Sequence, residues 1–65
     1  MKIFTERLQE CVAGKTQRVL AQATGIPQQT LSRYLSGKQT PDLERLVILC
    51  RYLGVTADYL LGLEN

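Results

Sequence analysis

Polar side chains that can form hydrogen bonds with the edges of nucleic-acid bases are concentrated in the stretch 28–36. At about 100° per residue, one arc of roughly 140° on a helix over this stretch carries only glutamine, serine and arginine. Glutamine and arginine can each make paired hydrogen bonds to a base in the major groove of DNA. The arc therefore predicts contacts to base edges, made by Gln28, Gln29, Ser32 and Arg33, and it also includes Ser36.

The lack of acids separates this arc from an ordinary exposed helix face, which usually carries charges of both signs and intrahelical ion pairs. The opposite side of the same predicted helix carries Thr30, Leu31, Tyr34 and Leu35. We expect that side to pack in the core. The alternative is that the polar arc consists only of solvated positions on a helix that packs through its other side.

Groups that can hold phosphate flank the arc in the sequence. Thr16 can cap a second helix that begins at Gln17, where unpaired backbone N–H groups and the positive end of the helix dipole attract an anion. A merely solvated Gln17 is the alternative. Basic and hydroxyl side chains before and after the two helices add further contacts. The predicted phosphate-contacting residues are Lys15, Thr16, Gln17, Arg18, Ser36, Lys38 and Gln39.

The charges of the chain are unevenly divided. Residues 11–41 contain Lys15, Arg18, Arg33 and Lys38 and no acid, which gives +4. The other residues hold the remaining four of the eight bases and all six acids, which gives −2 and a net charge of +2 for the whole chain. A positive half around two central helices is the pattern expected for a partner with a phosphate backbone. A chance distribution of so few charges is the alternative.

Groups that carry enzymatic or metal chemistry are missing from the sequence or isolated in it. The chain has no histidine, and neither cysteine is near another metal ligand. Because Cys11 and Cys50 fall at apolar positions of predicted helices, we interpret them as core thiols in a reducing cytoplasm and not as a disulfide. The sequence shows no glycine-rich phosphate loop and no catalytic constellation. We therefore expect no catalytic residue, no metal, no cofactor and no small-molecule ligand.

Membrane and export signals are also missing. The longest apolar run, Leu46–Cys50, is far shorter than the ~20 residues that cross a bilayer. The first residues do not form a signal peptide. These observations favour a cytoplasmic protein.

A first predicted helix spans about Thr5 to Ala13, within a single all-α domain over residues 1–65. Phe4, Leu8, Cys11 and Val12 recur at helical spacing, and Gly14 stops the helix. Thr5 is a candidate N-cap. We expect the polar side chains Glu6, Arg7, Gln9 and Glu10 to be solvated.

The segment Thr24–Pro27 joins the second and third predicted helices. Gly25 can adopt the left-handed conformation that closes a helix, Ile26 can enter the core, and Pro27 suits a helix start. A small residue, Ala21, lets the two helices approach closely. A short turn that contains glycine between two helices is the signature of a helix-turn-helix.

Two further predicted helices complete the chain. Thr40 or Asp42 caps the fourth, whose apolar stripe comprises Leu43, Leu46, Val47, Cys50 and Leu53. Gly54 ends it, and Thr56 caps the fifth, with Val55 and Leu60 as a hydrophobic staple. Four apolar residues outside these stripes are expected at a subunit interface or beneath the C-terminal tail: Ile48, Tyr52, Leu61 and Leu63.

From about Thr16 to Gly62 the chain resembles the lambda repressor-like helix-turn-helix family, which includes phage repressors, Cro proteins and many small bacterial regulators. The resemblance is carried by Thr16-Gln17, Leu20-Ala21, Gly25-Ile26, Leu31-Ser32-Arg33-Tyr34, Gly37-Lys38, Pro41, Leu53-Gly54-Val55 and Asp58-Tyr59-Leu60-Leu61-Gly62. Two features depart from it. The connection before Thr16 is about two residues shorter than usual, and Leu35-Ser36 stand where many members have glutamate and a polar residue.

The resemblance implies a compact five-helix bundle whose third helix enters the major groove. It implies that Gln17 holds phosphate and supports Gln28, and that subunits pair through the C-terminal portion. Two modules would then present their third helices to successive major-groove faces about 34 Å apart. The resulting hypothesis is a transcription regulator, a repressor that binds a pseudo-palindromic site on double-stranded DNA as a homodimer, at the bacterial or phage nucleoid.

Two other classes of protein are weighed against this hypothesis. A protein interaction module of the same fold without DNA binding would show apolar or acidic residues on the third helix, in contrast to the polar, acid-free arc. An enzyme needs a catalytic constellation, and fold alone does not exclude one. The sequence favours the regulator over both.

Overall fold

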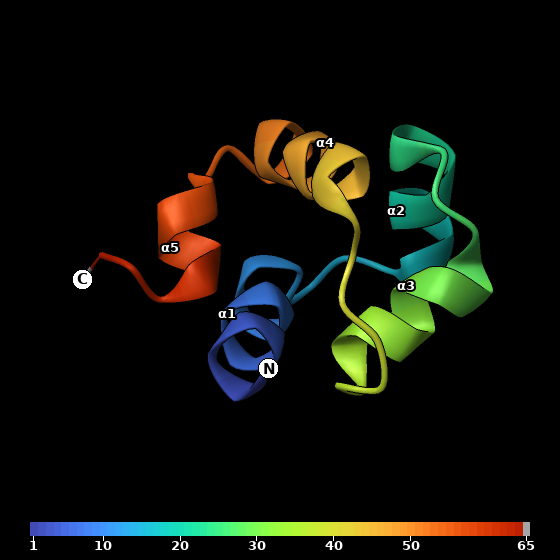
Figure 1. The fold of residues 1–65 in the computed structure, drawn as a ribbon. Helices are drawn as coiled ribbons and strands as arrows, with labels where there is room; N and C mark the ends of the chain where they lie inside the picture. The colour runs from blue at the N-terminus through green and yellow to red at the C-terminus, as the bar shows by residue number, and fades with distance from the viewer. Residues whose placement is uncertain (65) are drawn as a thin grey trace.

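The computed structural model describes residues 1–64 and contains five α-helices in that range. They are α1 (Lys2–Cys11), α2 (Gln17–Thr24), α3 (Gln28–Leu35), α4 (Leu43–Leu53) and α5 (Ala57–Leu61). α1 packs against α3 and α5, while α2 packs against α3 and α4, and α4 against α5. Figure 1 shows α1 at the centre, α2 and α3 on the right, α4 above and α5 on the left. The predicted all-α fold with five helices is confirmed.

The core is apolar and is formed by every helix. Its buried residues are Phe4, Leu8, Val12, Leu20, Ile26, Leu31, Tyr34, Leu46, Leu49 and Leu60. Cys11 and Cys50 are half-buried free thiols that pack against this core, as predicted, and burial raises the pKa of both thiols. None of the helices in the described part of the chain is long and apolar enough to cross a membrane.

The first helix begins earlier than the sequence indicated. α1 starts at Lys2 with Met1 at the N-cap position, so the prediction of Thr5 as the cap was wrong. The Thr5 hydroxyl lies within the first turn and donates to the Met1 carbonyl at 3.1 Å. The earlier start is explained by Phe4. Its side chain is buried in the core, so the residues around Phe4 are packed as part of the helix.

Two polar side chains of α1 were expected to be solvated but make tertiary contacts. The Arg7 guanidinium lies 4.5 Å from the centre of the Tyr59 ring and donates to the backbone carbonyls of Tyr59 and Glu64. The Gln9 amide donates to the Leu35 carbonyl at 2.6 Å. α1 is thereby joined to both α5 and the end of α3.

The close approach of α1 and the end of α5 depends on a glycine. Gly62 has φ +77°, and a Cβ atom there would lie 3.0 Å from the Ile3 side chain. A larger residue would be strained in its backbone and would push against α1. Gly62 therefore allows the end of α5 to pack on α1.

The inward side of α4 differs from the predicted apolar stripe. Leu46 is buried, and Cys50 and Leu53 pack against the core, but Leu43 is 81% exposed and Val47 48% exposed. The predicted stripe missed Leu49, which is buried. Eight of the eleven residues of α4 are apolar, so more than one face satisfied the helical periodicity and the sequence alone could not choose between them.

Side-chain caps define the starts of three helices. Thr16 accepts from the Val19 N–H at 3.2 Å, Asp42 from the Arg45 N–H at 2.9 Å, and Thr56 from the Tyr59 N–H at 3.0 Å. Of the two candidate caps for α4, the structure therefore selects Asp42 over Thr40. Each cap satisfies a backbone donor that a helix start otherwise leaves unpaired.

Candidate nucleic-acid interface

The connection between α2 and α3 is held by local hydrogen bonds. Gly25 adopts the left-handed conformation (φ 75°), and its N–H donates to the Ala21 carbonyl at 2.9 Å. The Thr24 hydroxyl donates to the Leu20 carbonyl at 2.7 Å and accepts from the Ile26 N–H at 3.2 Å. Ile26 is buried beneath the turn. The turn predicted at residues 24–27 is therefore confirmed, and it fixes the relative placement of α2 and α3.

The two sides of α3 are sharply separated. Leu31 and Tyr34 are only 2% and 1% exposed, whereas the predicted base-contacting face points to solvent. All five of its side chains are exposed: Gln28, Gln29, Ser32, Arg33 and Ser36. The packing of α3 thus exposes a row of side chains that can form hydrogen bonds.

A hydrogen bond from α1 holds the end of α3 from behind. The Gln9 amide donates to the carbonyl of Leu35, the last residue of α3. The buried Tyr34 places its hydroxyl near the Arg45 guanidinium, and this hydroxyl raises the pKa of Arg45. Sequence reasoning missed Gln9 and Arg45, because contacts between residues far apart in the chain leave no periodic signal. Gln9 supports the orientation of α3 through its bond to Leu35.

The predicted phosphate-contacting residues lie at the start of α2 and after the end of α3. Lys15, Thr16 and Arg18 are exposed around the α2 N-terminus, where Gln17 is half-buried. Ser36, Lys38 and Gln39 are exposed after α3, and the Ser36 hydroxyl donates to the Arg33 carbonyl at 3.2 Å. The hydrogen bonds of residues 1–64 include none between the Gln17 and Gln28 side chains, so the support of Gln28 by Gln17 stays a prediction.

The acids lie on the other elements. Glu6 and Glu10 are on α1, Asp42 and Glu44 are at the start of α4, and the rest follow in and after α5. The segment from Lys15 to Lys38 includes all of α2 and α3, and all of its charged side chains are positive. The unequal division of charge along the sequence is thus a division between elements of the fold.

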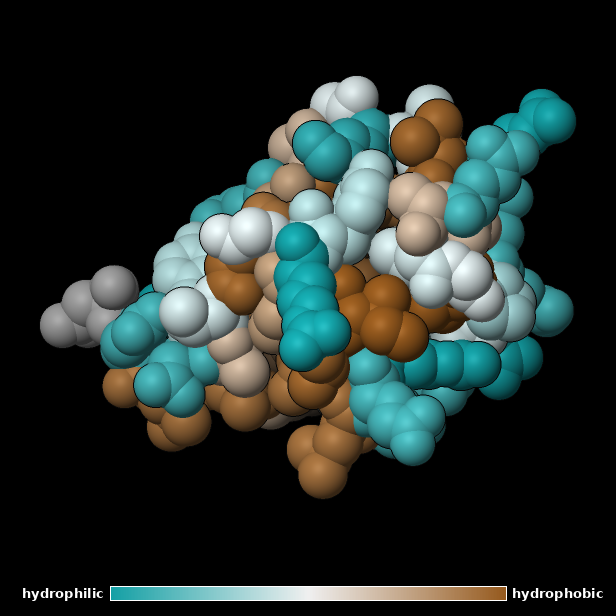
Figure 2. Space-filling view, turned by 90° about the horizontal axis from the view of Figure 1, so that it is seen from above, coloured by the Kyte–Doolittle hydropathy of each residue, from teal (hydrophilic) through white to brown (hydrophobic). Residues whose placement is uncertain are grey.

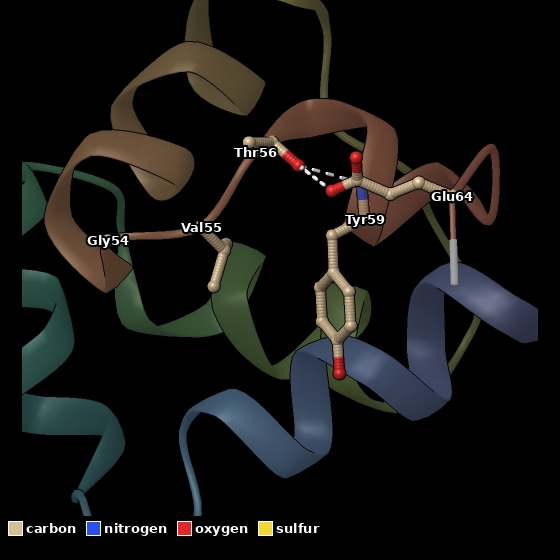
Figure 3. Close-up of a pocket in the computed structure, with 5 residues that line it drawn as sticks. All are labelled: Gly54, Val55, Thr56, Tyr59 and Glu64. Carbon is tan, nitrogen blue, oxygen red and sulfur yellow. Dashed lines mark hydrogen bonds between the residues drawn. The ribbon is translucent and has the colours of Figure 1, made fainter.

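Two other kinds of site were sought in the described residues, a metal site and a pocket. Within residues 1–64, no group of three or more cysteine, aspartate and glutamate side chains is placed to hold a metal ion. A small hollow of about 280 Å³ lies after the end of α4 and is lined by Gly54, Val55, Thr56, Tyr59 and Glu64. Figure 3 shows these five side chains. The Thr56 hydroxyl donates to the Glu64 carboxylate there at 2.6 Å. None of the predicted DNA-contacting residues lines this hollow.

The four residues predicted at a subunit interface have different environments. Ile48 and Tyr52 are exposed on α4, and Leu63 is exposed after α5. Leu61 is half-buried and packs against the core. Three of the four side chains are therefore available to a partner.

Comparison with known proteins relates this arrangement to a family. A family model described as helix-turn-helix matches residues 13–60. The SPbeta prophage-derived uncharacterized HTH-type transcriptional regulator YonR of Bacillus subtilis (strain 168) is 41% identical over 61 residues, which are 91% of this chain and 56% of that protein. The HTH-type transcriptional activator BcrR of Enterococcus faecalis is 36% identical over 64 residues, or 95% of this chain and 31% of that protein.

A third relative, the uncharacterized HTH-type transcriptional regulator YobD of Bacillus subtilis (strain 168), is 40% identical over 50 residues, or 77% of this chain and 45% of that protein. The chain thus spans about half the length of these relatives or less. No solved structure matches the chain. Because the family model covers most of the sequence, including α2, the turn and α3, the chain belongs to the lambda repressor-like helix-turn-helix family, which is not an enzymatic one.

Proposed function

We propose that residues 1–65 act as one DNA-binding domain of a transcription regulator and that α3 enters the major groove of double-stranded DNA. The observation that carries this proposal is the exposed face of α3, which has hydrogen-bonding side chains and no acid. Gln28 and Gln29 can each pair with adenine, Arg33 with guanine, and Ser32 with either. These four residues determine the preferred sequence.

Phosphate contacts position the domain on the duplex. The exposed Lys15, Arg18 and Lys38 supply charge, while the start of α2 offers backbone N–H groups near Thr16 and Gln17. The hydroxyl of Ser36 and the amide of Gln39 add neutral contacts. Such contacts fix register and carry no sequence information of their own.

The active form is a homodimer that binds a pseudo-palindromic site in the cytoplasm, at the nucleoid. A two-fold pair of modules matches the two-fold symmetry of such a site, with half-sites about one helical turn apart. We propose repression as the outcome, because a protein bound over a promoter blocks polymerase without any further contact. One relative is named an activator, so a reporter gene behind the selected site decides the sign of regulation.

Selection of bound sequences from a random double-stranded library tests the proposal. We expect one enriched half-site of defined sequence, present twice with a fixed spacing. Enrichment of single half-sites would contradict the homodimer but not DNA recognition. No enriched sequence in the presence of competitor DNA would overturn DNA recognition and favour an interaction module of the same fold.

A further inference from the structure

The solvent side of α4 is unusually apolar. Leu43, Val47, Ile48 and Tyr52 are 81%, 48%, 39% and 38% exposed, and Glu44 and Arg51 are exposed on the same helix. Figure 2 views the molecule from above, which is the side on which α4 lies in Figure 1, and shows brown apolar surface divided by teal hydrophilic side chains. Exposed apolar side chains that gather in this way usually mark an interaction surface.

These side chains have an ordered arrangement around the helix. At 100° per residue, Glu44 and Arg51 lie within about 20° of each other, so they form one line of opposite charges two turns apart. Leu43 and Val47 lie on one side of this line, and Ile48 and Tyr52 on the other. The exposed face of α4 is therefore a line of two opposite charges with an apolar pair on each flank.

The arrangement is complementary to an antiparallel copy of itself. Glu44 and Arg51 are separated by about 10.5 Å along the helix axis, and the midpoint lies between Val47 and Ile48. If a second copy of α4 is placed antiparallel across a two-fold axis at this midpoint, each Glu44 faces Arg51 of the partner subunit. The two Val47 side chains then meet on one flank of the axis, and the two Ile48 side chains meet on the other.

We propose that two copies of this chain associate through antiparallel α4 helices, with Val47 and Ile48 at the two-fold axis and a Glu44–Arg51 ion pair at each end. A contact between identical surfaces requires such self-complementarity. The occupant is a second copy because the charge pattern is complementary to itself and the apolar groups match across the axis. The pairing gives a specific geometry to the homodimer of the proposed function, but it requires no DNA.

A charge-exchange experiment tests the pairing without DNA. Glu44→Arg places two arginines opposite each other in a homodimer, and Arg51→Glu places two glutamates opposite each other. We expect each variant to raise the dimer dissociation constant by about tenfold or more, as like charges at an interface do. An equimolar mixture of the two variants restores both ion pairs, so it should form a heterodimer within about threefold of the original affinity. The double variant E44R/R51E should likewise recover as a homodimer.

Analytical ultracentrifugation, with folding midpoints measured for every variant, separates the outcomes. Val47→Glu should prevent association, whereas Val19→Glu, the same change at an exposed valine on α2, should not. Glu44 also lies near the N-terminus of α4 and Arg51 near its C-terminus, where each charge complements the helix dipole. If the dipole alone explains the two residues, both single variants lose folding stability and mixing them restores nothing.

Three results would overturn α4 pairing: a monomeric unmodified chain at high concentration, failure of the mixture to form the heterodimer, or loss of the dimer in Val19→Glu but not in Val47→Glu. None of these measurements involves DNA. Binding of the selected sequence, measured separately for the same variants, shows whether DNA recognition survives when α4 pairing fails. The proposed function and the proposed interface can therefore fail independently.

Discussion

The exposed sides of α3 and α4 differ in chemistry, although both helices turn their other side to one core. α3 presents glutamine, serine and arginine and keeps its large apolar groups buried. α4 presents four large apolar side chains together with one acid and one base. The polar surface of α3 suits a hydrated, uniformly charged polymer. The apolar surface of α4 suits another folded protein. Figure 1 shows the two helices in different parts of the molecule.

The largest expected effect comes from the buried side of α3. Tyr34→Ala removes a fully buried aromatic side chain whose hydroxyl raises the pKa of Arg45. We expect a loss of about 3–5 kcal/mol in the free energy of unfolding, as for other large aromatic truncations. Urea unfolding measures it, with Ser32→Ala on the exposed side of the same helix as control. An unchanged unfolding midpoint for Tyr34→Ala would contradict the packing of α3.

Changes on the exposed side of α3 should weaken DNA binding and leave folding stability unchanged. Gln28→Ala and Arg33→Ala should each weaken the selected site relative to random DNA by about 1–3 kcal/mol, because a paired hydrogen bond to one base is lost. Folding midpoints should hold, because alanine favours helix. Gln22→Ala on α2 is the matched control, since Gln22 is an exposed glutamine outside the predicted interface. Alanine variants that keep both their midpoint and their selected half-site would remove α3 as the base-contacting element.

The difference between α3 and α4 also explains how far the sequence could predict the structure. In α3 polar and apolar residues are cleanly segregated, so the buried and exposed sides follow from periodicity alone. In α4 most residues are apolar, and the side that faces inward is decided by contacts with α2 and α5. Features that depend on only a few neighbouring residues were also predicted correctly from the sequence, such as the caps Thr16 and Thr56 and the turn at Gly25.

Contacts over long sequence separations were beyond prediction. Gln9 bonds to Leu35, and Arg7 stacks on Tyr59, yet each is a polar residue on an exposed side of its helix in the sequence pattern. The start of α1 was misplaced for a related reason, because the burial of Phe4 outweighed a local capping signal at Thr5. The exposed face of α3 was therefore predictable from the sequence, but the contacts that hold α3 in place were not.

A smaller effect is expected from the contact behind α3. Gln9→Ala removes the bond from the side-chain amide to the Leu35 carbonyl, which should reduce the free energy of unfolding by about 0.5–1.5 kcal/mol. We expect affinity for the selected site to fall as well, under conditions in which the variant is fully folded, because the end of α3 loses an anchor. Glu10→Ala, a change at the adjacent exposed residue, is the control. Equal affinities for Gln9→Ala and the unmodified protein would limit Gln9 to a role in stability.

The smallest effect sharpens the electrostatic side of the comparison. If each of two subunits neutralises three or four phosphates, log K against log salt should have a slope of about −5 to −7. Lys38→Ala should weaken selected and random DNA alike and reduce the magnitude of the slope by about 1 per subunit, because a phosphate carries the same charge in every sequence. Lys2→Ala on α1 is the charge-matched control and should leave the slope unchanged, since Lys2 is an exposed lysine that is not among the predicted phosphate contacts. A slope near zero for the unmodified protein would remove the phosphate contacts from the proposal, and an equal change in both lysine variants would show that net charge, and not the position of Lys38 after α3, controls binding.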